Sequence, residues 1–360
     1  MVKVFIEKEN APELLMSLVF WPNFRFEISP KRLFLREIMA QYQTPFFESV
    51  SDISAADFVA VPHEYFEALR HAPQYLERVY ARAHAAHKKV LLFDYSDYVD
   101  KKISIPDHAI LFRVSAYRHH KKQNELVMPY FVEDFGERYG IVPREKGKSC
   151  VVGYCGQSQF GSTVKMFRAQ VKRFIHSFAL HLSFDAEPTA HIRGIFWRRR
   201  ALGALIRGGI SAAFVERAFY SLHRSGVPFD PQDIRREYAE NLRGCDLALC
   251  VRGDANASQR FYESLSASRI PLFLDTDCVL PLEEIIRYDE ALLRVPSREI
   301  ETLPARVREW WTKQTPSSFL AKEARARSIY EKYLRLDRYF ESIFDRERSP
   351  YKILFNDKWR

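Results

Sequence analysis

Two arginines, Arg252 and Arg260, flank a polar turn between an expected buried strand at 247–251 and an expected helix at 258–267. Ser258 stands at the expected N-cap, so the first backbone N–H groups of the helix would point toward the end of the strand. A guanidinium group binds two phosphate oxygens through parallel hydrogen bonds. The segment therefore predicts a site for a diphosphate.

One helical turn further along, Glu263 could reach two neighbouring hydroxyl groups, as a ribose presents them. The alternative is a solvent-facing glutamate that pairs with a nearby arginine. The arginines also have a structural interpretation, in which one braces the turn through Asp254 and the other is solvated. Asn256 either contacts the ligand or shapes the turn. Taken with the arginines, Glu263 indicates a nucleotide-binding half-site.

Two further positions fit this half-site. Gly156 follows an expected strand at 150–154, and its small size would let the backbone approach a phosphate, although a tight turn without a ligand is the alternative. Arg193 opens a basic, aromatic segment at 193–207, which either lies on an anionic membrane or is a solvated helix of the second domain. In another interpretation Arg193 faces the phosphates. The predicted nucleotide-binding residues are Glu263, Arg260, Arg252, Ser258, Gly253, Asn256, Gly156 and Arg193.

Short apolar runs alternate with longer helical patterns, which predicts an α/β fold with parallel sheets and crossover helices. Strands are expected at 2–6, 58–61, 90–93, 110–112, 150–154, 247–251 and 271–274, and helices at 63–87, 163–182, 258–267 and 318–344. A stretch rich in glycine, proline and charge at 140–149 predicts an interdomain linker. We expect an N-terminal domain at 1–145, a nucleotide-binding domain at 146–317 and a C-terminal helical segment at 318–360.

The composition is that of a folded protein with an excess of base. The 360 residues include 55 Lys and Arg and 46 Asp and Glu, which gives a net charge of +9. This charge fits an anionic partner, but it does not distinguish a nucleotide from a nucleic acid or an acidic lipid. Residues 1–6 read as a strand and not as a secretory signal, and the apolar run at 14–21 is too short to cross a bilayer. We therefore expect a soluble protein. Five cysteines without a Cys-x-x-Cys pair predict reduced thiols and no metal site.

The segment around Arg252 resembles the exostosin family of glycosyltransferases. That family has an arginine–glycine pair after a strand, a serine and an arginine that open a helix, a glutamate within the helix, and a following strand that begins with Ile-Pro. In this sequence the corresponding residues are Arg252-Gly253, Ser258, Arg260, Glu263 and Ile270-Pro271-Leu272. Residues 234–246 fit the approach to this segment, 275–281 is similar to short bacterial members, and 42–62 is similar to an early helix and strand of the family. Ser268 departs from the pattern, because the family usually has a glycine there.

The resemblance implies a GT-B fold, in which two Rossmann-like domains, the first on the acceptor side, face each other across a cleft and the C-terminal helix packs back toward the first domain. It also implies transfer of a sugar from a nucleotide-sugar donor with inversion and without a metal or other cofactor. The residues predicted to bind nucleotide would then bind the nucleotide-sugar. Animal and plant members begin with a membrane anchor that this sequence lacks. The implied setting is therefore the bacterial cytoplasm, with peripheral contact at the inner membrane face, and the synthesis of surface polysaccharide.

An inverting transfer needs a general base on the acceptor side, because the attacking hydroxyl must lose its proton. Candidates stand at or just beyond the ends of expected strands in the first domain: Asp94, Glu64, His63 and Asp97. Each could instead be a helix cap or a loop residue. Asp275-Thr-Asp277 superficially resembles a metal-binding motif but follows a strand, so we interpret it as a turn. Arginines and helix N-termini are then expected to stabilise the departing diphosphate.

The leading hypothesis is a glycosyltransferase that acts on a glycan or a lipid-linked glycan acceptor. A second hypothesis is a catalytically silent subunit that binds a sugar nucleotide or a glycan and supports a partner transferase, because a donor half-site can persist without a base. A nucleic-acid-binding protein is least favoured, since the basic residues are dispersed along the chain and no nucleic-acid-reading module is recognisable.

Overall fold

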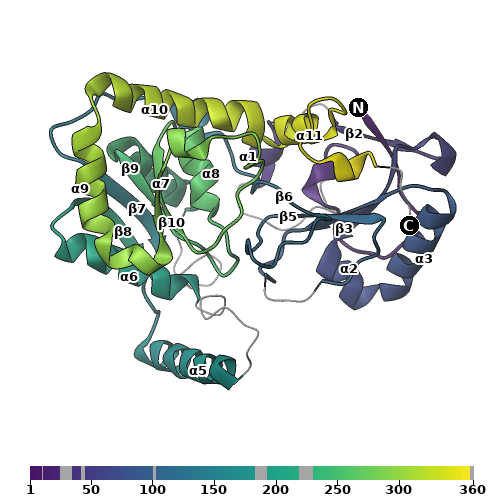
Figure 1. Ribbon diagram of the computed structural model, residues 1–360, viewed down its shortest axis with the longest axis horizontal. Coiled ribbons are helices and arrows are strands. Elements are labelled where there is room, and N and C mark those ends of the chain that lie inside the picture. Colours follow the sequence, from purple (N-terminus) through teal and green to yellow (C-terminus); the bar gives the residue numbers. More distant parts are fainter. Residues whose placement is uncertain are drawn as a thin grey trace. The chain divides into compact units, whose positions relative to one another are not determined.

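The protein consists of two compact units. The computed structural model describes residues 1–9, 11–24, 35–41, 45–99, 103–182, 193–218 and 230–356, so residues 42–44 of the family-like segment at 42–62 lie outside it. Unit 1 comprises residues 1–133, 279–286 and 331–360, and unit 2 comprises 134–278 and 287–330 (Figure 1). The expected linker at 140–149 lies within unit 2, and the expected segment at 318–360 is divided between the units after Tyr330.

Unit 1 contains a parallel sheet of six strands in the order β2-β1-β3-β4-β5-β6. Its strands are β1 (Val2–Phe5), β2 (Phe47–Val50), β3 (Phe58–Glu64), β4 (Val90–Asp94), β5 (Ala109–Arg113) and β6 (Glu125–Val127). Its helices are α1 (Leu35–Met39), α2 (Tyr65–His71), α3 (Pro73–Ala85) and α11 (Leu336–Phe344), with 3-10 turns at η1 (Leu18–Phe20), η3 (Ile53–Ala55) and η8 (Lys352–Leu354). The central strands β4 and β5 are buried throughout, as parallel strands covered on both faces are.

Two expected helices are each interrupted. The helix expected at 63–87 is divided into α2 and α3, because Pro73 has no amide hydrogen to continue the first helix and instead occupies the first turn of the second. The helix expected at 318–344 is divided into α10 (Pro316–Ile329), a π turn, η7 (Tyr330–Leu334), and α11, because the backbone of Arg335 is extended.

The helix α11 closes one face of the unit 1 sheet with aromatic side chains. The ring of Phe340 lies 5.5 Å from that of Phe47, 5.6 Å from that of Phe112 and 6.3 Å from that of Phe93. Each of these rings is buried, so together they form a continuous apolar layer. The predicted return of the C-terminal helix to the first domain is therefore confirmed for α11.

Unit 2 contains a parallel sheet of five strands in the order β11-β10-β9-β7-β8. Its strands are β7 (Val151–Gln157), β8 (Ser211–Arg217), β9 (Leu247–Cys250), β10 (Ile270–Asp275) and β11 (Leu293–Pro296). Its helices are α4 (Phe135–Tyr139), α5 (Thr163–Leu182), α6 (Gly194–Arg207), α7 (Pro231–Gly244), α8 (Gln259–Ser266), α9 (Leu303–Lys313) and α10, with 3-10 turns at η5 (Tyr288–Glu290) and η6 (Ser297–Thr302).

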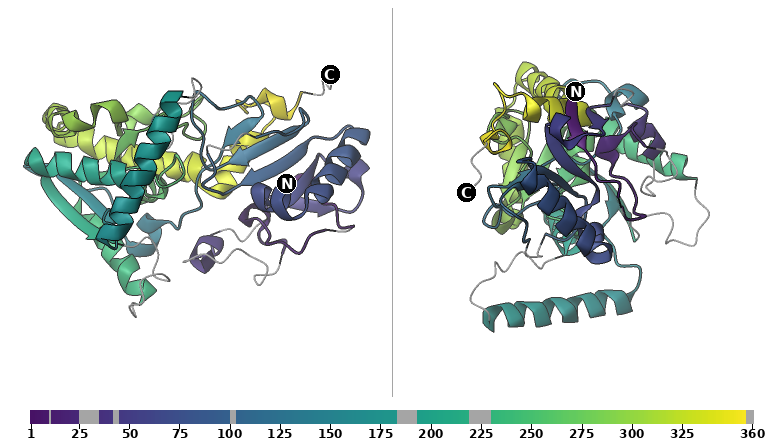
Figure 2. Two further views of the ribbon diagram at one scale, coloured as in Figure 1. Left: turned by 90° about the horizontal axis from the view of Figure 1, so that it is seen from below. Right: turned by 90° about the vertical axis from the view of Figure 1, so that its right-hand side faces the viewer.

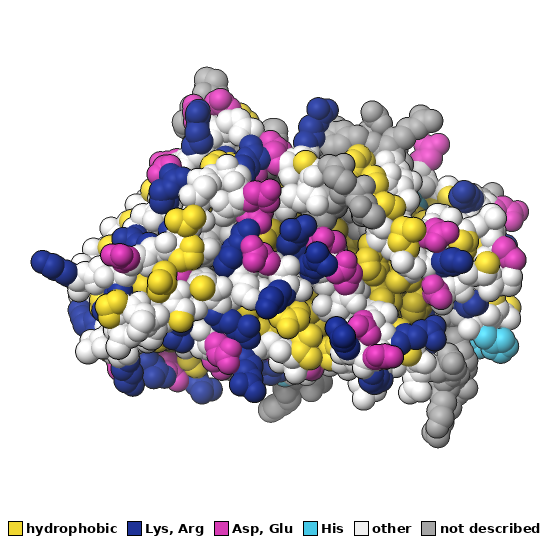
Figure 3. Space-filling view, turned by 90° about the horizontal axis from the view of Figure 1, so that it is seen from above, with side chains coloured by type: hydrophobic (Ala, Val, Ile, Leu, Met, Phe, Trp, Pro, Cys, Tyr) yellow, Lys and Arg dark blue, Asp and Glu magenta, His cyan; other side chains and the backbone are white. Residues whose placement is uncertain are grey.

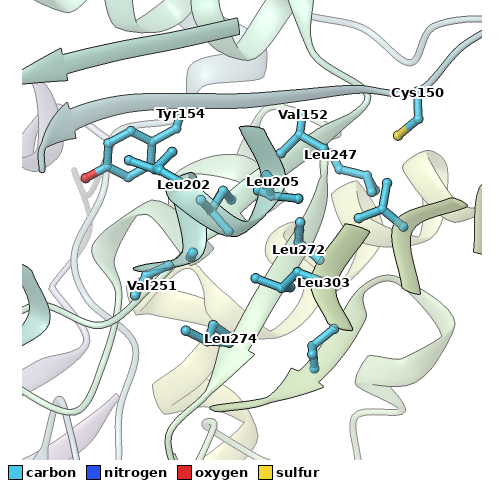
Figure 4. Packing of buried hydrophobic residues seen from close by; sticks show 14 of the residues in the cluster. Cys150, Val152, Tyr154, Leu202, Leu205, Leu247, Val251, Leu272, Leu274 and Leu303 are labelled. Atoms are coloured by element: carbon cyan, nitrogen blue, oxygen red, sulfur yellow. The ribbon is translucent and has the colours of Figure 1, made fainter. Parts of the chain in front are cut away.

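The core of unit 2 lies between this sheet and its helices (Figure 4). Alternate residues of the strands point into it, among them Val152 of β7 and Leu272 of β10. The helix α6 contributes Leu202, Leu205 and Trp197 to the same core. These apolar side chains of the segment at 193–207 are thus covered by protein, while Ile206 is exposed, and the packing favours the interpretation as a helix of the second domain.

The sheets establish the class of fold. All seven predicted strands are present, with ends shifted by at most three residues. Two parallel sheets flanked by helices, with a C-terminal helix that belongs to the first unit, are the features predicted for a GT-B protein, and the predicted fold class is confirmed.

Ser268 occupies a turn that glycine would fit better. The amide of Arg269 donates to the carbonyl of Ser264 at 2.8 Å, and the amide of Ser268 donates to the carbonyl of Leu265 at 3.1 Å. This is the hydrogen-bond pattern of a Schellman C-cap, which requires a left-handed residue after the helix. Ser268 adopts that conformation, with φ of 55°. The glycine usual in the related family is therefore explained by the backbone.

We expect Ser268→Gly to raise the free energy of unfolding by about 1 kcal/mol, because glycine adopts the left-handed conformation without a Cβ clash. Urea unfolding followed by circular dichroism measures the change. The matched control is Ala267→Gly, where φ is −88° and the same loss of side chain should destabilise the protein. A Ser268→Gly variant less stable than the wild type would contradict this account of the turn.

Candidate functional site

Two carboxylates meet at the carboxyl end of the unit 1 sheet. Glu64 ends β3 and Asp94 ends β4, and the two strands are parallel neighbours in which Glu64 pairs with Phe93. Strand ends of a parallel sheet form the edge where ligand sites usually lie. The structure therefore brings together two of the four residues predicted as candidate bases.

Asp94 is held in place by its neighbours. Its Oδ1 accepts hydrogen bonds from the amide of Ser96 at 2.8 Å and from the Ser96 hydroxyl at 2.6 Å, while its Oδ2 lies 3.2 Å from Nη2 of Arg113. Arg113 also pairs with Glu125, with 3.1 Å between Nη1 and Oε2. Because Asp94 is 1% exposed, these contacts compensate a buried charge and fix the orientation of its carboxylate.

Glu64 is the less enclosed member of the pair. Its Oε2 accepts a hydrogen bond from the amide of Glu67 at 2.8 Å and so caps α2. A helix cap was the alternative to a catalytic base in the sequence analysis. Burial, followed by the negative charge of Asp94, raises the pKa of Glu64 to about 8. A carboxylate with such a pKa is a stronger base than an ordinary glutamate, and it gains or loses a proton near neutral pH.

The other two candidate bases occupy different surroundings. His63 is buried, its Nδ1 donates to the carbonyl of Leu15 at 3.2 Å, and its ring packs against Tyr75. Burial lowers the pKa of His63. Asp97 lies exposed in the loop after β4. The buried imidazole fits a structural role, so Glu64 and Asp94 are the stronger candidates.

In unit 2, the arginines of the predicted half-site contact the protein's own backbone. Arg252 is buried, and its Nη2 donates to the carbonyl of Asp254 at 2.7 Å, which braces the turn after β9. The guanidinium of Arg260 lies 4.3 Å from the centre of the Tyr154 ring and donates to the carbonyl of Cys155. The interpretation in which an arginine braces this turn is therefore realised by Arg252, through the backbone of Asp254.

Gly156 provides the space for Arg260. A Cβ on Gly156 would lie 2.5 Å from Nη2 of Arg260, closer than any side chain tolerates. The space that the sequence assigned to a donor phosphate is thus filled by a guanidinium. The Nε of Arg260 is buried and has no hydrogen-bond partner among the described residues.

Arg193 lies at the surface of the same region. It occupies the N-cap position of α6, and its exposed guanidinium lies 3.4 Å from the carboxylate of Asp254. Gly253 lies beside the start of this helix, because a Cβ on Gly194 would meet the Gly253 carbonyl at 2.3 Å. Ser258 is at the N-cap of α8 as predicted, but its side chain makes no capping hydrogen bond. Arg193 is therefore the predicted arginine best placed to meet a ligand.

Asn256 clamps two loops together. Its Nδ2 donates to the carbonyls of Thr276 at 3.2 Å and Asp277 at 3.3 Å, and its Oδ1 accepts from the Thr276 hydroxyl at 2.6 Å. The side chain is fully buried. Of the two interpretations, shaping the turn is the one that this geometry favours.

Glu263 is the centre of a buried polar cluster. Its Oε1 accepts from Arg235 at 3.1 Å and from Gln259 at 2.9 Å, and its Oε2 accepts from the Tyr238 hydroxyl at 2.7 Å. Burial opposes ionisation, but Arg235, Tyr238 and Gln259 outweigh it and hold the pKa of Glu263 below its ordinary value. Glu263 is therefore paired with an arginine as the alternative proposed, although inside the protein and not at its surface.

Sequence reasoning missed three side chains that organise this region. Arg235 and Tyr238 are three residues apart on α7, a helical spacing in a segment already noted as family-like. Arg198 of α6 is buried, and it donates from Nε to the carbonyl of Arg252 at 3.2 Å and from Nη1 to that of Gln157 at 3.0 Å. No pattern distinguished Arg198 from its basic neighbours, because both acceptors are backbone groups distant in sequence.

The remaining motifs are structural. Asp275 accepts from the amide of Cys278 at 2.9 Å and pairs with Arg294 at 2.9 Å, and Asp277 has a left-handed backbone, so this motif is a turn as predicted. Among the described residues no group of His, Cys, Asp and Glu is arranged to hold a metal ion. The five cysteines are free and buried, as predicted.

A cavity of about 390 Å³ lies next to α5 and α6 in unit 2. It is bordered by Phe160 of the preceding loop, by Thr163 and Met166 at the start of α5, and by Arg199 and Ile206 of α6. None of the predicted nucleotide-binding residues lines it.

Comparisons with known proteins agree with the predicted resemblance. Residues 191–310 match the model of the Exostosin GT47 domain. The chain is 31% identical over 103 residues to the Exostosin-1 homolog of Caenorhabditis elegans, a match that covers 28% of this chain and 25% of that protein. It is 34% identical over 80 residues to Exostosin-1c of Danio rerio, covering 22% of this chain and 11% of that protein.

Among solved structures, a glycosyltransferase from Rickettsia africae ESF-5 matches 84% of this chain and 78% of its own at 11% identity, with a TM-score of 0.37. The chain spans a quarter or less of the length of the two curated relatives. The predicted resemblance to the exostosin family is confirmed, and the matching segment contains α6, α7, β9 and α8.

We expect Glu263→Ala to lower the free energy of unfolding by about 3–5 kcal/mol, because it leaves the buried Arg235 without a counter-charge. Urea unfolding measures the loss. The control Glu240→Ala removes an exposed glutamate of α7 that pairs with Arg243, and it should cost less than about 1 kcal/mol. If the two substitutions lowered the free energy of unfolding equally, Glu263 would not be the centre of a buried polar cluster.

Proposed function

We propose that this protein is a glycosyltransferase that transfers a sugar from a nucleotide-sugar donor to a hydroxyl of a glycan or lipid-linked glycan acceptor, with inversion. The observation that carries the proposal is the match of residues 191–310 to the Exostosin GT47 domain. This segment includes Arg193 at the N-cap of α6, Arg252 after β9 and Arg260 in α8. As the proposed setting we retain the bacterial cytoplasm and the synthesis of surface polysaccharide, on the similarity of residues 275–281 to short bacterial members.

In the proposed mechanism, unit 2 binds the donor diphosphate. Arg193 is exposed at the start of α6, and the buried Arg252 and the half-buried Arg260 add positive charge near it. Preorganised positive groups stabilise the charge that develops on a leaving diphosphate. The proposal therefore requires no divalent cation, and activity should persist in the presence of a chelator.

Unit 1 supplies the base in this mechanism. The acceptor oxygen forms a bond to the anomeric carbon on the face opposite the diphosphate, the bond from that carbon to the diphosphate oxygen breaks, and the acceptor proton passes to Glu64. Asp94 keeps the proton affinity of Glu64 high through its negative charge, so it acts as a positioning residue and not as the base. The raised pKa of Glu64 is the feature that supports this role.

A nucleic-acid partner receives no support from the face of the protein shown in Figure 3. On the face shown in Figure 3, Lys and Arg side chains are interspersed with Asp and Glu. Proteins that bind nucleic acid gather basic residues in a patch or stripe.

A panel of nucleotide sugars with glycan acceptors, in the presence of EDTA, tests the reaction. We expect kcat/KM of the wild type to rise with pH and level off above about 8, because Glu64 must be ionised to accept a proton. Glu64→Gln should lower kcat by about 10²–10⁴-fold and remove this pH dependence, while nucleotide affinity stays unchanged. The control Glu67→Gln changes an exposed neighbour on α2.

The same titration provides a check on folding. The pKa of Glu64 in the folded protein lies above its ordinary value, so the free energy of unfolding should decrease as pH rises from about 4.5 to about 8. Glu64→Gln should abolish this decrease.

Full activity of Glu64→Gln would refute the assignment of the base. Nucleotide binding by the wild type without transfer or hydrolysis would indicate a silent binding subunit.

We expect Arg193→Ala to weaken the binding of nucleoside diphosphates about tenfold, the effect of losing one charge-assisted hydrogen bond. Calorimetric titration measures the affinity. The control Arg200→Ala removes another exposed arginine of α6, one that pairs with Glu301, and should leave affinity unchanged. Equal affinities of wild type and Arg193→Ala would remove Arg193 from the donor site.

A further inference from the structure

The helix α5 exposes a stripe of large apolar side chains. Val164, Phe167, Val171, Phe174 and Ile175 are between 41% and 74% exposed, and they make up five of the twelve exposed large hydrophobic residues found among the described positions. Their spacing places them along one side of the helix. Single exposed apolar residues are ordinary, but a concentration of this kind marks a surface that binds something.

Among the described residues, no part of unit 2 covers this stripe. Figure 1 and the right-hand view of Figure 2 show α5 standing away from the sheet of its unit. Only the start of the helix, at Thr163 and Met166, borders the cavity next to α6. Its described residues do not belong to the core cluster of unit 2, whereas the neighbouring α6 places Trp197, Leu202 and Leu205 in that core. The apolar side of α5 therefore has no partner among the described residues of unit 2.

The charge of α5 indicates the chemistry of that partner. The helix contains no Asp or Glu over residues 163–182, and the exposed Lys165, Arg168 and Lys172 follow one flank of the apolar stripe, as 100° per residue requires. Apolar residues including phenylalanine, bordered by lysine and arginine without acidic residues, are the pattern of helices that lie in the surface of an anionic bilayer.

The cavity beside α5 adds further apolar and charged groups next to the helix. Met166 of α5 borders it together with Phe160 and Ile206, and the charged residues of its lining are Arg199 and Glu216. Among the described residues no helix is both long and apolar enough to cross a bilayer. A surface orientation, with the helix axis parallel to the membrane, is therefore the arrangement that suits α5.

We propose that α5 attaches this protein to the surface of a membrane that contains anionic phospholipids. The apolar stripe enters the boundary between headgroups and acyl chains, and the basic flank contacts the lipid phosphates. This attachment uses a different helix from the segment at 193–207 in which the sequence suggested membrane contact. It does not depend on the proposed transferase activity, because it requires neither donor nor acceptor.

Flotation of the full chain with lipid vesicles tests the proposal. We expect the protein to bind vesicles of phosphatidylcholine mixed with phosphatidylglycerol more tightly than vesicles of phosphatidylcholine alone, and the difference should diminish as salt is added. The double variant Phe167→Ser with Phe174→Ser should lower partitioning at least about tenfold. The double variant Lys165→Glu with Lys172→Glu should abolish the preference for phosphatidylglycerol.

Two matched controls lie outside α5. Val142→Ser removes an exposed apolar side chain, and Lys148→Glu reverses an exposed charge, so both should bind vesicles as the wild type does. Thermal unfolding establishes that every variant is folded. Unchanged vesicle binding in the α5 variants would overturn the proposal. A second outcome would also overturn it. If the wild type failed to bind vesicles but formed a dimer in analytical ultracentrifugation, and the phenylalanine variant did not form that dimer, the stripe would contact a second copy of the chain.

Discussion

A buried ion pair between Arg269 and Glu323 is the constraint on which the organisation of unit 2 depends. The two side chains are at most 2% exposed, and 3.2 Å separates Nη1 of Arg269 from Oε1 of Glu323. Arg269 also donates to the carbonyl of Leu242 at 2.8 Å and to that of Val142 at 3.1 Å. One guanidinium therefore ties the start of β10 to the end of α7, to α10 and to the segment before β7. Leaving one partner of such a pair alone typically costs about 3–5 kcal/mol, which makes the arrangement specific.

This constraint determines what the neighbouring polar residues can do. Because α7 is anchored at its end, Arg235 and Tyr238 reach Glu263 on α8, and the loop after β9 is held between that helix and the clamp at Asn256. Much of the surplus positive charge is consequently directed inward, where arginines bind the protein's own carbonyl and carboxylate groups. Arg193 and the basic flank of α5 are among the positive charges that remain at the surface of this unit.

In unit 1, too, a buried arginine pairs with carboxylates and determines what the neighbouring polar residues can do. The strand order places β3 beside β4 and β4 beside β5, so three ionisable strand-end residues, Glu64, Asp94 and Arg113, are collected at one edge. Arg113 compensates Asp94, and Glu64 has no arginine of its own among the ion pairs of the described residues. Its raised pKa follows from this unequal distribution of charge. The chemistry proposed for the protein is thus a consequence of strand order.

The sequence alone determined the local features: the parallel α/β class, seven strands, the N-cap position of Ser258 and the family-like segment, because periodicity and turn residues act over a few positions. It also placed Glu64 and Asp94 at strand ends. The short β6 and the exposed β8 carry too weak a pattern to be recognised. Only the tertiary structure decided that Asn256 and Glu263 are buried within protein clusters, that α6 belongs to the core and that α5 does not. Burial and pairing depend on residues far apart in the chain, which no local pattern records.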